Sequence, residues 1–136
     1  MSRTTSPTDV NRLELRLEAE APSVPRVRAD VAAFASRHAL ANPRDVALAV
    51  TEAATNAVVH AYRGGDSGSM RVVACAEPTG LVVVIRDYGC GMQPNPDSPG
   101  PGLGLSVIGA IAAEMKIERP NDGGTRVRIR FPLESG

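Results

Sequence analysis

A carboxylate, an amide and an imidazole recur at intervals of four residues in one short stretch of the chain. Glu52, Asn56 and His60 lie in a run rich in Ala and Val that predicts a helix, so the three polar groups stack along one helix face. Two glycine clusters follow, Asp87–Gly91 and Gly100–Gly104. A carboxylate and an amide on a helix, followed by two glycine loops, outline a site for a nucleotide and its phosphates.

The second glycine cluster does not match the two commonest nucleotide-binding loops. A P-loop needs Gly-Lys-Ser/Thr, and the only lysine, Lys116, lies far from any such loop. A dinucleotide fingerprint has Gly-x-Gly-x-x-Gly directly after a strand, whereas the spacing here is Gly100-x-Gly102-x-Gly104 after a Pro-rich stretch. What remains is a loop that leads into a helix N-terminus, where free N–H groups and the helix dipole favour anionic oxygens.

Each of these groups also has a purely structural interpretation. Glu52 could be a solvated helix carboxylate, and Asn56 could be a hydrogen-bonded amide of the core. His60 lies near the helix end, where a cation suits the dipole, so a capping role is as plausible as a functional one. The glycines could serve a tight turn and a hinge. The order and separation of the helix and the two loops favour the nucleotide site.

Composition limits the kind of protein. The chain has 136 residues, for which we expect a flexible tail at residues 1–10 and one domain at residues 11–136. Aromatic residues make up only 3%, so the core must be built from Val, Leu, Ile and Ala. The formal charge is zero, which disfavours direct nucleic-acid binding or attachment to an anionic membrane. Two cysteines and the lack of a secretory signal or an apolar span favour a cytoplasmic protein.

The elements that must position these groups follow from the hydrophobic periodicity. We expect a strand at 13–17, helices from Ser23 and from Asn42-Pro43 to about Ala61, strands at 70–76 and 81–87, a helix at 103–115, and strands at 116–119 and 125–131. This order predicts an α+β fold, a two-layer α/β sandwich. A mixed, mostly antiparallel sheet is covered on one face by three helices. The exposed sheet face would carry Arg126, Arg128 and Arg130.

The motifs, at this order and separation, resemble those of the histidine-kinase-like ATPase superfamily, over about residues 13–133. Glu52-x-x-x-Asn56 resembles the family's magnesium helix, and Asp87-x-Gly89-x-Gly91 its adenine-recognition loop. The cluster Gly100–Gly104 resembles its phosphate loop, and Gly124-Thr125 its closing Gly-Thr element.

Within the superfamily, residues 51–62 and 123–127 most resemble the small anti-sigma-factor serine/threonine kinases. The resemblance implies ATP and Mg²⁺ as cofactors. It implies phosphorylation of a serine or threonine on an anti-sigma-factor antagonist protein, and binding to a sigma factor. Members of this family are commonly homodimers.

The resemblance also implies a role for each site residue. Glu52 would be the general base for the incoming hydroxyl, and Asn56 would coordinate Mg²⁺. Asp87 would accept a hydrogen bond from the adenine amino group, and Thr125 would reach the adenine through water. The alternatives are a strand-end turn residue for Asp87 and a simple strand former for Thr125. The remaining nucleotide contacts would come from Gly89, Gly91, Met92, Gly100, Gly102, Leu103 and Gly104.

The chain departs from the family pattern in the segment Met92–Pro101, which would form the lid over the phosphates. This segment contains no Arg or Lys, although longer family lids often place a cation near the transferred phosphate. Arg63 and Arg86 are candidates to replace that charge. The departure leaves open an alternative function, a catalytically weak or inactive ATP-binding module that regulates a sigma factor or an antagonist through protein contacts.

Overall fold

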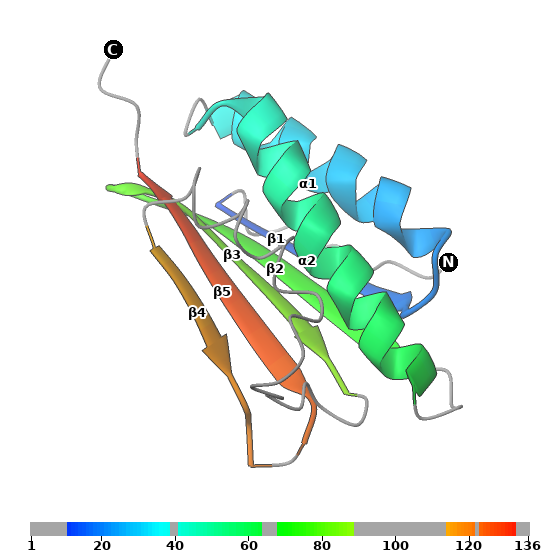
Figure 1. The fold of residues 1–136 in the computed structure, drawn as a ribbon. Coiled ribbons are helices and arrows are strands. Elements are labelled where there is room, and N and C mark those ends of the chain that lie inside the picture. The colour runs from blue at the N-terminus through cyan, green and yellow to red at the C-terminus, as the bar shows by residue number, and fades with distance from the viewer. Residues whose placement is uncertain (1–10, 39–40, 64–67, 89–113, 122, 133–136) are drawn as a thin grey trace.

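The computed structural model describes residues 11–38, 41–63, 68–88, 114–121 and 123–132. Its elements in chain order are β1 (Arg12–Glu18), α1 (Ser23–His38), α2 (Pro43–Arg63), β2 (Ser69–Glu77), β3 (Gly80–Asp87), β4 (Glu114–Glu118) and β5 (Thr125–Pro132). The five strands form one sheet in the order β1-β2-β3-β5-β4, and α1 and α2 lie together on one of its faces (Figure 1). All four pairings among these strands are antiparallel, which confirms the predicted α+β two-layer fold.

The core lies between the two helices and the sheet. Strand residues alternate between this core and the open face, because successive side chains of a strand point to opposite sides. The core is aliphatic apart from Phe34 and Phe131, as the composition predicts. The strands contribute to it Leu13, Leu15, Met70, Val72, Ala74, Leu81, Val83, Ile85, Val127, Ile129 and Phe131.

Helix α2 begins where the sequence predicts. The side-chain oxygen of Asn42 accepts a hydrogen bond from the backbone N–H of Arg44 at 2.9 Å, and Pro43 occupies the first turn. The buried residues of α2 recur at helical spacing, and most are Val or Ala: Val46, Ala49, Val50, Ala53, Ala54, Ala57 and Val58. Small side chains let the helix lie close to the sheet.

One predicted boundary is wrong. A helix continuing to Met115 and a strand starting at Lys116 do not agree with the structure, in which β4 already begins at Glu114. Met115 pairs with Ile129 of β5 and packs against the core, a cross-strand contact that the periodicity of the chain cannot reveal. The predicted third helix otherwise lies outside the described residues, as do the N-terminal tail and the lid segment. Neither α1 nor α2, the helices of the described part, is long and apolar enough to cross a bilayer.

Candidate functional site

Helix α2 ends at the same end of the sheet as β3. It finishes at Arg63 and β2 starts at Ser69, so a short connection joins them. The next residue of β2, Met70, pairs with Asp87, the last residue of β3. Figure 1 shows α2 crossing the sheet towards this end, and α2 contacts β3, β2 and β5. The carboxyl-terminal half of α2 therefore runs towards the end of the sheet at which β3 finishes.

Asn56 is a buried amide on this half of α2. Its side chain is 7% exposed, and among the described residues its Nδ2 atom has no hydrogen-bond partner. A buried polar group left without a partner costs about 1–3 kcal/mol, so such groups require an explanation. Glu52 lies one turn earlier and is half-buried. Because Nδ2 is a hydrogen-bond donor, this arrangement fits a ligand that offers an acceptor oxygen, such as a phosphate oxygen, beside the carboxylate of Glu52.

Asp87 and Thr125 lie side by side at the same sheet end. They pair across β3 and β5, and both side chains are almost fully buried, at 2% and 1% exposure. Gly124, just before Thr125, has a φ of +78°, and a Cβ added there would overlap the backbone oxygen of Asp87. Glycine is thus required for β5 to start against the end of β3. A buried carboxylate and a hydroxyl are thereby positioned next to each other on the helix side of the sheet.

Of the predicted site residues, the structure pairs Asp87 with Thr125 at this end of the sheet. It places Glu52 and Asn56 one turn apart on α2, the helix that contacts β3 and β5. The other predicted nucleotide contacts lie outside the described residues: Gly89, Gly91, Met92, Gly100, Gly102, Leu103 and Gly104. The side chains of His60 and Arg63 are also outside the described part.

Arg86 is not a replacement for the missing lid cation. It precedes Asp87 in the strand and therefore points to the opposite, open face of the sheet. There its guanidinium lies over the ring of Tyr88, 4.6 Å from the ring centroid, and it donates to the carbonyl of Gly123 at 3.4 Å.

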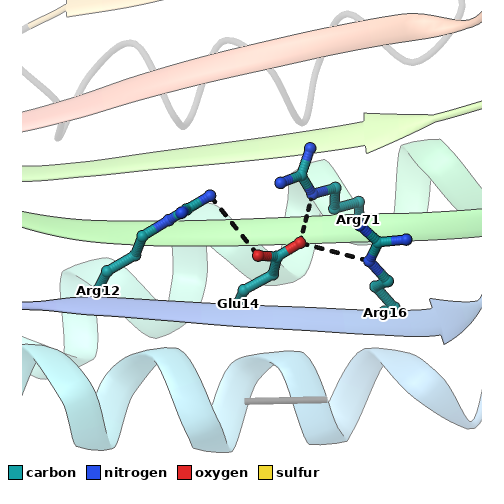
Figure 2. Close-up of polar contacts among 4 residues, drawn as sticks. All are labelled: Arg12, Glu14, Arg16 and Arg71. Carbon is teal, nitrogen blue, oxygen red and sulfur yellow. Dashed lines mark hydrogen bonds and ion pairs between the residues drawn. The ribbon is translucent and has the colours of Figure 1, made fainter. Parts of the chain in front are cut away.

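Sequence reasoning missed an arginine cluster on the open face. Glu14 of β1 accepts a hydrogen bond from Arg71 of β2 at 2.7 Å, and Arg16 and Arg12 approach it at 3.3 Å and 3.6 Å (Figure 2). The hydrogen bond from Arg71 lowers the pKa of Glu14 below its ordinary value. The alternation of charge along β1 was visible in the sequence, but the register that places Arg71 beside Glu14 was not.

The fold and these positions agree with a comparison against known families. The family description "Histidine kinase-like ATPase domain" matches residues 17–131 of the chain. The chain belongs to the histidine kinase-like ATPase family. The match includes α2, β3 and nearly all of β5, the elements that carry the candidate residues Glu52, Asn56, Asp87 and Thr125. It confirms the resemblance found in the motifs.

The chain is also similar to individual proteins named anti-sigma F factor. The chain is 31% identical over 133 residues to the anti-sigma F factor of Clostridium acetobutylicum, covering 88% of this chain and 92% of that protein. It is 24% identical to the anti-sigma F factor of Clostridium novyi, over 92% of this chain and 96% of that protein. It is 25% identical to the anti-sigma F factor of Shouchella clausii, over 90% of this chain and 93% of that protein. Membership of an ATPase family implies that the chain binds ATP.

Proposed function

We propose that this protein is an anti-sigma-factor-type serine/threonine kinase that binds Mg-ATP and phosphorylates an antagonist protein. The observation that carries the proposal is the buried amide of Asn56, without a partner for Nδ2 among the described residues, one helical turn from the half-buried Glu52. The relatives named anti-sigma F factor support a sigma factor as one partner, and the antagonist is what the resemblance in the motifs implies. Phosphorylation of the antagonist would regulate transcription by partner switching, and we expect a cytoplasmic homodimer.

In this proposal the adenine binds beside the paired Asp87 and Thr125, and its amino group donates to the Asp87 carboxylate. The buried position of both side chains supports this role, because a hydrogen bond to a charged group gains strength when water is excluded. The glycine clusters at residues 89–91 and 100–104 would present backbone N–H groups to the phosphates.

Glu52 acts as the general base of the proposed reaction. The hydroxyl oxygen of the antagonist's serine or threonine bonds to the γ-phosphorus, the bond from that phosphorus to the bridging oxygen breaks, and ADP leaves. Glu52 accepts the hydroxyl proton. Mg²⁺, held through the side-chain oxygen of Asn56 and the phosphates, would neutralise phosphate charge. The side chain of Asn56 offers a single amide oxygen, so phosphate and water oxygens would supply further ligands.

The proposal is tested by incubating the protein with γ-labelled ATP, Mg²⁺ and candidate antagonist proteins. We expect labelled phosphoserine or phosphothreonine in one antagonist, and none when Glu52 is replaced by Gln. Glu77→Gln is the matched control, because Glu77 is exposed at the opposite end of the sheet. Absence of label in every antagonist, with ATP binding intact, would overturn the kinase activity.

A second candidate function is a catalytically weak or inactive ATP-binding module that regulates a sigma factor or an antagonist. The orientation of Arg86 favours it, because the one candidate cation that the structure describes faces away from α2. The two functions differ in their need for phosphotransfer. Partner capture that is equal with ATP and with a non-hydrolysable analogue supports the binding module, whereas a requirement for hydrolysable ATP supports the kinase.

A further inference from the structure

Four arginines form a continuous row across the open face of the sheet. Arg16 of β1 pairs with Arg71 of β2, which pairs with Arg86 of β3, which in turn pairs with Arg126 of β5. Directly paired residues of neighbouring antiparallel strands have Cβ atoms about 5 Å apart, and like charges in such positions repel. We call these four residues the arginine row. This repulsion destabilises the folded state, and the local strand structure does not require arginine at these positions.

In the described part of the chain, two carboxylates of the same face pair with residues of the row. Glu14 is shared by Arg12, Arg16 and Arg71, so three guanidinium groups meet one carboxylate (Figure 2). Glu118 of β4 accepts a hydrogen bond from Arg126 at 3.0 Å at the other end of the row. The cluster around Glu14 keeps an excess of positive charge that a further carboxylate would reduce.

A hollow of about 200 Å³ lies beside the arginine row. Val73 of β2 and Val84 of β3, which pair with each other, line this hollow. Arginines of β1, β2, β3 and β5 line the rest of it: Arg12, Arg71, Arg86, Arg126 and Arg128. Helices α1 and α2 cover the opposite face of the sheet (Figure 1). The hollow therefore combines an apolar floor with cationic walls, on the side of the sheet away from Glu52 and Asn56.

We propose that this open face binds an acidic segment of a partner protein, in which carboxylates alternate with aliphatic side chains. The carboxylates would pair with the arginine row, and an aliphatic side chain would cover Val73 and Val84. A nucleic acid fits less well, because Glu14 and Glu118 stand among the arginines and the chain has no net charge. A second copy fits less well, because a two-fold interface would oppose the same cationic face to itself.

The test measures binding of the full chain to fluorescein-labelled peptides by fluorescence anisotropy at about 150 mM salt, where exposed charges are screened beyond about 8 Å. The probes are a peptide of alternating Asp and Leu, a peptide of alternating Lys and Leu, and a single-stranded DNA oligonucleotide. The test variant carries Arg71→Gln and Arg126→Gln. The matched control carries Arg28→Gln and Arg44→Gln, which remove two exposed arginines from the helix layer.

We expect the Asp-Leu peptide to bind and the Lys-Leu peptide not to bind. The affinity for the Asp-Leu peptide should fall at least about tenfold in the test variant and less than about twofold in the control variant. Saturating ATP should leave the affinity unchanged, so a failure of the nucleotide site would not affect this result. Equal affinity of the test variant and the wild type, or tighter binding of the oligonucleotide, would overturn the proposal. So would a sedimentation experiment in which the wild type is a dimer that the test variant dissociates.

Discussion

The backbone of Gly124 lies so close to the carbonyl oxygen of Asp87 that a Cβ at position 124 would overlap it. The residue has a φ of +78°, a conformation that L side chains rarely adopt. The contact sets the start of β5 against the end of β3 and aligns Thr125 with Asp87. This close approach constrains the geometry of the candidate adenine site.

Replacing Gly124 by Ala should therefore disturb both stability and nucleotide binding. The left-handed backbone alone costs a residue with a Cβ about 1–2 kcal/mol, and the overlap with Asp87 adds to that cost. Gly123→Ala is the matched control, because Gly123 also has a positive φ but open space around it. Urea denaturation should show a larger loss of unfolding free energy for Gly124→Ala. Equal losses would mean that the contact with Asp87 is not tight in the protein.

The buried amide of Asn56 should lower the free energy of unfolding of the protein when no nucleotide is bound. Asn56→Leu replaces a buried donor without a described partner by an apolar side chain of similar size, so we expect the free energy of unfolding to rise by about 1 kcal/mol or more. Thr55→Leu is the control, because Thr55 is the exposed neighbour on the same helix. A clear loss of stability in Asn56→Leu would instead support the alternative that Asn56 is a satisfied amide of the core.

Glu52 should affect transfer and not affinity. Glu52→Gln keeps the shape of the side chain but removes its ability to accept a proton, so we expect the rate of phosphotransfer to fall about 10²–10⁴-fold. The dissociation constant for ATP should change by less than about threefold. Single-turnover kinetics with the antagonist, beside calorimetry with ATP, separates the two quantities. Parallel loss of rate and affinity would assign Glu52 to binding rather than to proton transfer.

Glu14 should make the folded state sensitive to acid. Its pKa is lowered in the folded protein, chiefly by the hydrogen bond from Arg71, from an ordinary value of 4.5. A lowered folded-state pKa stabilises the fold above the ordinary pKa, and this stabilisation is lost as the pH falls through the folded-state value. Glu14→Gln should therefore flatten the acid limb of the stability curve below about pH 4.5. The double-mutant cycle of Glu14→Gln with Arg71→Gln checks the cause, and additive effects would exclude coupling between the two side chains.

Much of the fold was predictable because its local signals agree with the tertiary structure. Asn42 and Pro43 mark the start of α2, and the alternation of Leu13, Leu15 and Leu17 marks β1. The start of β4 at Glu114 was missed, because Met115 is drawn into the sheet by its pairing with Ile129. Local periodicity carries no information on such long-range pairs.

The roles of the candidate site residues stay predictions, and only part of their geometry follows from the spacing. Glu52 and Asn56 lie one turn apart on a helix, a relation that spacing alone reveals, and the burial of Asn56 is in keeping with it. The juxtaposition of Asp87, Gly124 and Thr125 was not visible in the spacing, since residues so distant in the chain meet only through the β3–β5 register. The position of Arg126 on the exposed sheet face was predicted, but its alignment with the other arginines of the row was not, because that alignment also depends on strand register.

The central claim is that α2, the end of β3 and the start of β5 form one ATP site, and calorimetric titration of the purified protein with Mg-ATP tests it most directly. We predict saturable binding of one ATP per chain, with an affinity that is weakened at least about tenfold in Asn56→Leu and unchanged in Thr55→Leu. Absence of saturable binding to the folded wild-type protein, or equal affinity in both variants, would contradict it.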